Sequence, residues 1–215
     1  MILSVMQPYF FPHLGYYEQV SQSDEFVLFD DVNFIKRGWI NRNFLTLDGQ
    51  QKLFTIPLKS QSQNRLINEH EIFRGPELVK FIKSIERTYS KCKHFNVGYS
   101  ILSEALEEVL ISKACEKSIS LVADYLGITT KITNSSDLAY DRHGNGQSKI
   151  LSICSIKAPS VYLNAAGGSH LYDANSFGEI QLKFMPPTTS ALSIIDLLMR
   201  YDREGILEKM STLAI

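Results

Sequence analysis

Residues 1–31 decide the fold, and they read MILSVMQPYFFPHLGYYEQVSQSDEFVLFDD. Two short apolar runs, Ile2–Met6 and Phe26–Phe29, flank a segment whose pattern from Leu14 to Gln22 is helical. A short apolar run that ends in polar or turn-forming residues is typical of a buried strand. The stretch therefore predicts a β–loop–α–β unit, which favours two parallel strands joined by a right-handed crossover.

The rest of the chain continues this alternation of helices and strands. Asp48-Gly49 predicts a β-hairpin. Helical patterns fill residues 76–126, namely Glu77–Tyr89, Tyr99–Val109 and Ser112–Leu126. Later strands are predicted at Lys131–Thr133, Ser160–Leu163 and Leu182–Met185, and later helices at Gln147–Lys157 and Ser190–Tyr201. We therefore expect an α/β fold with a parallel-sheet core, formed by one domain over residues 1–215 with 76–126 as a helical subregion.

Composition narrows the functional class. The chain has 215 residues, 44% of them hydrophobic, and a formal net charge of −1, so it lacks the basic excess typical of nucleic-acid-binding proteins. Its three cysteines are widely spaced and form no CxxC pair, which favours a reducing compartment. Met1 leads straight into a strand pattern without a basic leader, and the longest apolar run is too short to span a membrane. We expect a cytoplasmic protein without a membrane span.

Polar side chains follow several of the predicted strands directly. In open α/β sheets, ligands bind beyond the carboxyl ends of the strands. We therefore expect a site where the strands that end at Gln7, Asp30 and Asn164 converge.

The first of these strand ends leads into an aromatic segment and a histidine. Tyr9 and Tyr16 could stack on a sugar or a base, although aromatic residues here could equally pack in the core. His13 stands at the turn into the first helix, where it could bind phosphate or act as a general base. It could also simply cap the helix.

The second strand end carries two adjacent carboxylates, Asp30 and Asp31. Buried carboxylates need partners, and a nearby cation such as Lys36 or Arg37 could supply one. Alternatively, Asp30 could bind sugar hydroxyls and Asp31 could act as a base. No spacing of His, Cys and Asp suggests a metal site.

The loop after these carboxylates is the richest in polar chemistry. Arginine and lysine suit a phosphate or pyrophosphate group, asparagine suits sugar hydroxyls, and tryptophan suits a ring. A solvated basic loop anchored by its tryptophan is the alternative. The candidate binding residues are Lys36, Arg37, Trp39, Asn41, Arg42 and Asn43.

A second loop of this kind follows the strand that ends near residue 163. Asn164, Gly167 and Gly168 could let a ligand approach the backbone closely, and His170 is a further candidate acid or base. A glycine pair is also a common turn.

Longer motifs carry a resemblance to a known family. They include Gln7-Pro8-Tyr9-Phe10-Phe11-Pro12, Leu14-Gly15-Tyr16, Lys36-Arg37-Gly38-Trp39-Ile40-Asn41-Arg42-Asn43, Phe54-Thr55-Ile56-Pro57 and Ser193-Ile194-Ile195-Asp196-Leu197-Leu198. On these residues the chain resembles the WbqC-like family, over nearly its whole length. The resemblance implies a role in building bacterial O-antigen or similar surface glycans. It also suggests acyl or aminoacyl transfer to an amino sugar.

A more distant likeness concerns His13-Leu14-Gly15-Tyr16. This run stands where the nucleotidyltransferase and class I synthetase folds carry a His-x-Gly-His signature, which faces nucleotide phosphates at a helix N-terminus. Tyr16 replaces the second histidine and cannot supply a positive charge.

Together these observations predict a transferase that binds a phosphate-bearing or nucleotide-linked sugar and an acyl or aminoacyl donor. His13, Asp31 or His170 would deprotonate the attacking group. A nucleotidyltransferase-like enzyme and a non-catalytic sugar-binding or scaffold module are the alternatives. The sequence predicts neither a cofactor nor an oligomeric state.

Overall fold

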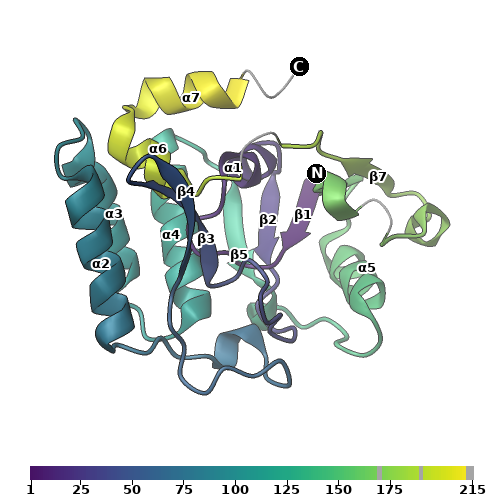
Figure 1. The fold of residues 1–215 in the computed structure, drawn as a ribbon. Helices are drawn as coiled ribbons and strands as arrows, with labels where there is room; N and C mark the ends of the chain where they lie inside the picture. The colour runs from purple at the N-terminus through teal and green to yellow at the C-terminus, as the bar shows by residue number, and fades with distance from the viewer. Residues whose placement is uncertain (169–170, 189–190, 212–215) are drawn as a thin grey trace.

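The computed structural model describes residues 1–168, 171–188 and 191–211, and its centre is a five-stranded parallel sheet (Figure 1). The strands are β1 (Ile2–Met6), β2 (Glu25–Leu28), β5 (Lys131–Asn134), β6 (Val161–Asn164) and β7 (Gln181–Phe184). Their order is β5-β2-β1-β6-β7, and every neighbouring pair is parallel. The predicted α/β class and parallel core are confirmed.

Seven helices surround this sheet in the described residues, and one β-hairpin packs beside them. Figure 1 shows α2 and α3 on the side of the molecule opposite α5. The helices are α1 (Leu14–Ser21), α2 (Pro76–Tyr89), α3 (Phe95–Ala105), α4 (Ile111–Leu126), α5 (Gly146–Lys157), α6 (Ile194–Arg200) and α7 (Arg203–Ser211). The hairpin consists of β3 (Arg42–Leu47) and β4 (Gln50–Thr55).

The two faces of the sheet carry separate apolar cores, because side chains alternate along a strand. Phe26 and Leu28 of β2 face a large cluster that includes residues of α1, α2, α4 and α6. Val27 of the same strand faces a smaller cluster with Leu3, Tyr162 and the inner side of α5. The sheet is therefore covered on both faces, as a buried parallel sheet requires.

The strand order reverses direction at β1. From β1 the chain winds outward through β2 to β5, and it then returns to place β6 on the other side of β1. In open α/β sheets this reversal is the position where connections leave in opposite directions and a crevice opens between the strand ends.

The crevice starts where β1 and β6 stop pairing. Their register joins Ile2 to Val161 and Leu3 to Tyr162, although both strands continue further. Beyond this point the Leu163 carbonyl accepts hydrogen bonds from side chains, from Ser4 Oγ at 2.8 Å and Gln19 Nε2 at 3.1 Å. Side chains thus satisfy a buried backbone oxygen, and the strand ends can part without losing a hydrogen bond.

The C-terminal end of the chain differs from the expected single helix over Ser190–Tyr201. The helix α6 begins at Ile194, where Ser193 Oγ caps it by accepting from the Ile195 amide at 3.3 Å. Ser193 also forms a bridge with His13, so this residue is extended and not helical. A further helix, α7, follows α6 and was not predicted.

A buried polar contact ties α2 and α6 to the hairpin. The Tyr89 hydroxyl donates to Asp196 Oδ1 at 2.5 Å and lies 3.1 Å from the Thr46 carbonyl oxygen. The Arg200 Nε atom donates to the other carboxylate oxygen of Asp196 at 3.1 Å. Burial and the neighbouring carboxylate raise the pKa of Tyr89, so its hydroxyl stays protonated as the donor.

We predict that Tyr89→Phe lowers the free energy of unfolding by about 1–3 kcal/mol, because it removes a donor from a buried carboxylate. Urea denaturation followed by circular dichroism measures this loss. Tyr99→Phe is the matched control, since Tyr99 donates to Glu86 at the surface, at 2.6 Å. Equal losses in the two variants would contradict the prediction.

Candidate functional site

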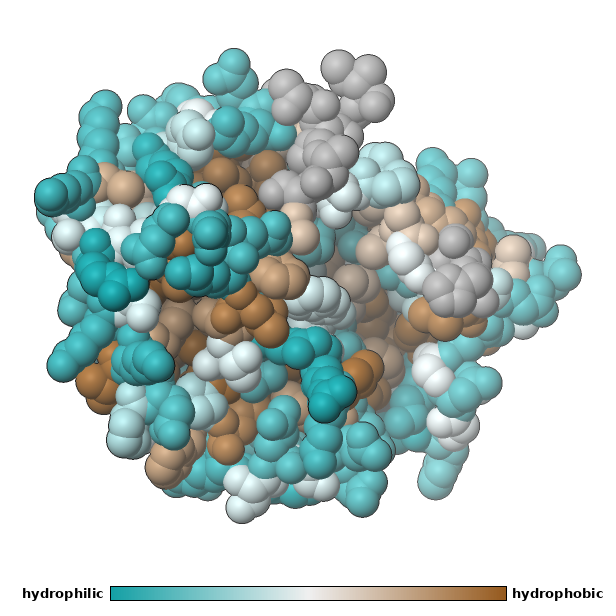
Figure 2. All heavy atoms as spheres, viewed as in Figure 1, coloured by the Kyte–Doolittle hydropathy of each residue, from teal (hydrophilic) through white to brown (hydrophobic). Residues whose placement is uncertain are grey.

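A cavity of about 740 Å³ opens at the carboxyl ends of β1, β2 and β6. In Figure 2 the surface is hollowed to the right of centre, and hydrophobic residues form part of its walls. The volume is that of a small-molecule site, and the position is the reversal point of the sheet. The lining residues are Val5, Met6, Gln7, Tyr9, Phe29, Ile35, Trp39, Asn145, Gly146, Gln147, Ile150, Asn164, Ala165, Gly167, Gly168, Leu171 and Tyr172.

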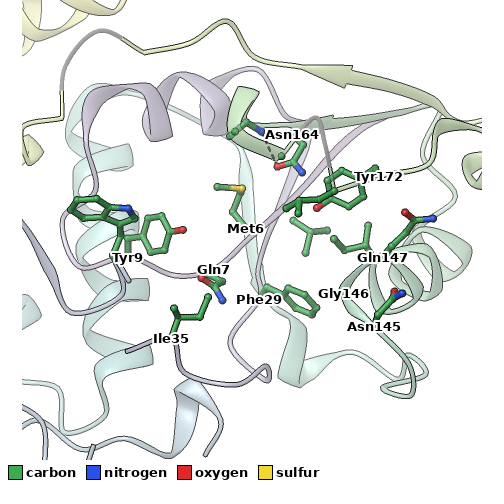
Figure 3. Close-up of a pocket in the computed structure, with 17 residues that line it drawn as sticks. Met6, Gln7, Tyr9, Phe29, Ile35, Asn145, Gly146, Gln147, Asn164 and Tyr172 are labelled. Carbon is green, nitrogen blue, oxygen red and sulfur yellow. Dashed lines mark hydrogen bonds between the residues drawn. The ribbon is translucent and has the colours of Figure 1, made fainter. Parts of the chain in front are cut away.

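Two sides of the cavity face each other across the ends of β1 and β2. Figure 3 shows Gln7, Tyr9 and Ile35 on one side and Asn145, Gln147 and Tyr172 on the other. Met6 and Phe29 lie between the two sides. The first side comes from the segment after β1 and the loop after β2, and the second comes from α5 and the segment before β7.

The second side includes the N-terminus of α5. Asn145 caps this helix, because its Oδ1 accepts from the Ser148 amide at 2.9 Å. The first amides of a helix have no partner within the helix, and they carry partial positive charge. Gly146 lines the cavity at this point, so the cavity is bordered by backbone donors that suit an anion.

The loop after β6 brings backbone close to the cavity. The buried Asn164 uses Oδ1 to accept from the Ala165 amide at 2.8 Å. A Cβ atom at Gly168 would lie 2.7 Å from Asn164 Nδ2, so a side chain at this position would have to displace the Asn164 amide. A Cβ atom at Gly167 would meet no atom within 4 Å, which leaves open space above that residue for a ligand.

Two tyrosines shape the first side. The Tyr16 hydroxyl donates to the Gln7 carbonyl at 3.0 Å, and the Tyr9 and Tyr16 rings are 5.7 Å apart. Tyr16 is therefore a buried support beneath the wall, whereas Tyr9 lines the cavity. Burial raises the pKa of Tyr9, so its hydroxyl can donate a hydrogen bond to a ligand and does not act as a base near neutral pH.

The residues of the basic loop, 36–43, differ in whether they reach the cavity. Trp39 lines the cavity, but Lys36 and Arg37 are exposed and do not line it. Arg42 supports Trp39, since its guanidinium lies 5.6 Å from the indole centroid and its Nε donates to the Gly38 carbonyl at 2.7 Å.

The two asparagines of this loop are buried and bind backbone. Asn41 Nδ2 donates to the Ile56 carbonyl at 2.7 Å, and Asn43 Nδ2 donates to the Phe11 carbonyl at 3.1 Å. The Asn41 amide closes the base of the hairpin, the Asn43 amide fastens the hairpin to the segment after β1, and neither residue lines the cavity.

Asp31 belongs to a buried polar network at the ends of β2 and β5. It accepts from Arg142 Nε at 2.7 Å, from the Tyr140 hydroxyl at 2.8 Å and from the Ser135 hydroxyl. The cation that pairs with Asp31 is therefore Arg142, and the suggested pairing with Lys36 or Arg37 is wrong. Arg142 replaces them because the segment after β5 runs alongside the end of β2.

Asp30 belongs to the same network. It accepts from the Ser136 amide at 2.9 Å, from Ser136 Oγ at 2.8 Å and from Ser135 Oγ at 3.1 Å. Neither Asp30 nor Asp31 lines the cavity.

Of the two candidate histidines, only His13 lies in the described part of the chain. His13 precedes α1, pairs with Ser193 and does not line the cavity. Its Nδ1 is buried without a hydrogen-bond partner in the described part of the chain, and burial lowers the pKa of its imidazole. His170 lies outside the described residues.

The cavity lining is uncharged. Among the described residues that line it there is no Asp, Glu, Lys, Arg, His or Cys. The described residues also contain no group of three or more His, Cys, Asp or Glu placed to hold a metal ion. No described helix is long and apolar enough to cross a membrane.

Several lining residues were not predicted from the sequence, chiefly Asn145, Gln147 and Tyr172. Asn145 before a helical run is an N-cap signal, which could have placed a helix start at this sheet edge. The position of Tyr172 at the cavity depends on the path of the chain between β6 and β7, which no local pattern predicts.

Comparisons with known proteins identify the family of the chain. A model of the WbqC-like protein family matches residues 7–207. The chain belongs to the WbqC-like protein family. A relative from Mycobacterium tuberculosis, named as uncharacterized protein Rv1507c, is 23% identical over 185 residues, which cover 84% of this chain and 79% of the relative. No solved structure matches the chain.

We predict that Arg142→Met lowers the free energy of unfolding by about 1–3 kcal/mol, because it removes a charged hydrogen bond from buried Asp31. Urea denaturation measures the effect. Lys113→Met is the control, since the Lys113–Glu116 pair is at the surface and should contribute less than about 1 kcal/mol. A loss no larger than that of the control would contradict the prediction.

The burial of His13 makes the stability of the fold depend on pH. Because the folded state lowers the pKa of His13 below its usual 6.5, the unfolded chain takes up this proton at a higher pH. The contribution of His13 to stability is complete above pH 6.5 and is lost as the pH falls towards the folded pKa. His13→Gln should therefore flatten the pH dependence of the unfolding free energy below pH 6.5, as measured by urea denaturation at a series of pH values. An unchanged pH dependence would contradict the prediction.

Proposed function

We propose that this WbqC-like protein is a transferase of bacterial surface-glycan biosynthesis that binds a nucleotide-linked amino sugar in the cavity between β1 and β6. Acyl or aminoacyl transfer to the sugar amine is the proposed reaction. The observation that carries the proposal is the cavity itself, which joins aromatic rings, side-chain amides and backbone donors at the reversal point of the sheet.

The sugar and base portions of such a ligand have suitable partners. Tyr9, Trp39 and Tyr172 offer aromatic faces, and pyranose and nucleobase rings both pack well on such faces. Gln7, Gln147 and Asn164 carry amides that can donate to and accept from hydroxyl groups.

The phosphate portion requires donors without a side-chain cation in the lining. The amides at the start of α5 and the backbone around Gly167-Gly168 can supply them, as helix N-termini and glycine-rich turns do for phosphates elsewhere. Lys36 and Arg37 stand beside lining residues on the same loop, where their charge would attract an anionic ligand to the entrance.

Catalysis in this proposal does not use Asp31, whose oxygens are occupied by Arg142, Tyr140 and Ser135. His13 stands outside the lining. His170 remains the proposed base for the attacking amine, since it follows the lining residue Gly168 closely in sequence.

The nucleotidyltransferase-like alternative has less support. A methyl group added at Gly15 would lie 1.8 Å from Thr188 Cγ2, so the turn at the start of α1 is covered at this point. Tyr16 donates to the Gln7 carbonyl and is buried. The position where a His-x-Gly-His signature would meet phosphates is therefore packed against protein.

A non-catalytic sugar-binding module is the second candidate, and one observation favours it. The described lining holds no ionisable group except the tyrosine hydroxyls, so it can bind a neutral sugar without an acid or base. A transferase would convert its ligand to a product, whereas a sugar-binding module would not. Mass spectrometry of a UDP-linked amino sugar incubated with protein and an acyl thioester shows the added acyl mass only for a transferase.

We predict that Gly167→Asp weakens binding of a UDP-linked amino sugar about tenfold or more relative to Gly167→Asn. Both side chains fit the open space above Gly167, but only aspartate repels a phosphate. Calorimetry on the purified variants measures the two dissociation constants. Equal affinity in the two variants would place the phosphate elsewhere, and absence of any binding to the unmutated protein would refute the proposed ligand.

A further inference from the structure

Three large apolar side chains stand at the entrance of the cavity and face water. Ile35, Trp39 and Leu171 all line the cavity, yet they are 52%, 43% and 61% exposed. A side chain that both lines a cavity and is this open lies at its mouth. Apolar groups gathered at one opening indicate a surface that meets another apolar phase.

The loop that presents two of them is firmly built. Phe34 and Ile40, on either side of the exposed tip, are fully buried. The backbone amide of Phe34 donates to the Arg65 carbonyl at 2.9 Å, and the Ile40 carbonyl accepts from the Phe10 amide at 2.8 Å. The loop is thus fixed at both ends, and the exposure of its tip is part of the fold.

The tip itself is a tight turn. The Gly38 amide donates to the Ile35 carbonyl at 3.0 Å, and Arg37 has a left-handed backbone with φ of 62°. Arg42 then holds the Gly38 carbonyl and the face of Trp39. These contacts turn Ile35 and Trp39 outward, although a sequence pattern would place such residues in the core.

Two cations accompany the apolar side chains. Lys36 and Arg37 lie between Ile35 and Trp39 and are exposed. Among the described residues, no ion pair joins either of them to an acidic group. Other surface cations, such as Lys59 and Lys113, do have acidic partners. The mouth therefore combines unpaired positive charge with exposed Ile, Trp and Leu.

We infer that the mouth of the cavity docks on an anionic membrane surface. Tryptophan and aliphatic side chains partition into the headgroup region, and neighbouring cations bind anionic lipid. A soluble acidic partner would pair with Lys36 and Arg37, but it would have to bring a matching apolar surface as well, whereas an anionic membrane supplies both. The docked cavity opens towards the bilayer. This inference does not depend on which ligand occupies the cavity.

Trp39 makes the test direct, because it is the single tryptophan of the chain. The full-length protein is mixed with phosphatidylcholine vesicles that do or do not contain phosphatidylglycerol. We expect the emission of Trp39 to shift to shorter wavelength and to be quenched by brominated lipid in the anionic vesicles. Affinity should be about thirtyfold lower for pure phosphatidylcholine, and it should fall with salt.

Two double variants identify the contact. Lys36→Gln with Arg37→Gln should lose the preference for anionic vesicles, and Ile35→Ser with Leu171→Ser should lose the quenching of Trp39. The matched controls lie on other surfaces, namely Lys80→Gln with Lys83→Gln on α2 and the exposed Val109→Ser. Circular dichroism and urea denaturation establish that each variant is folded.

Three results would overturn the inference. The first is an emission of Trp39 that no vesicle changes at low salt. The second is vesicle binding that the control variants weaken as much as the mouth variants. The third is an emission shift that follows protein concentration without lipid, which would assign the mouth to a second copy of this chain. None of these results involves a sugar ligand, so they are independent of the test with Gly167→Asp.

Discussion

The structure depends on how β1 and β6 part. The two strands pair over only two residues each, and further along, Ser4 and Gln19 satisfy the Leu163 carbonyl in place of backbone amides. An unsatisfied carbonyl at this depth would cost about 1–3 kcal/mol. Two buried side chains therefore allow a cavity to open in the middle of a parallel sheet without breaking the sheet.

The candidate polar residues fall into two places, a buried carboxylate network and the uncharged lining of the cavity. The carboxylates of Asp30 and Asp31 are bound in a network with Ser135, Ser136 and Arg142, and they fix the end of β2 to the segment after β5. The cavity beside them is left with amides, hydroxyls, aromatic rings and backbone donors. Such a lining offers hydrogen bonds and aromatic stacking, and the start of α5 adds the partial positive charge of a helix N-terminus.

The sequence predicted the fold well where local patterns were strong. Ile2–Met6 became β1 at the expected residues, because a short apolar run between turn signals has few alternatives. The end of the chain was less predictable, since the tertiary bridge between Ser193 and His13 delays the start of α6. A pairing of this kind joins residues 180 positions apart and leaves no local signal.

Local patterns along the chain were enough to predict the parallel α/β core and to identify the family. These follow from hydrophobic periodicity and from motifs that are continuous along the chain. Only the tertiary structure decided which candidates reach the cavity. Gln7, Tyr9, Trp39 and Asn164 line it, whereas Asp31 turns to Arg142 and Asn41 and Asn43 turn to backbone carbonyls. The reason is physical, because a buried polar group takes whichever partner packing brings within reach, and distant segments supply that partner.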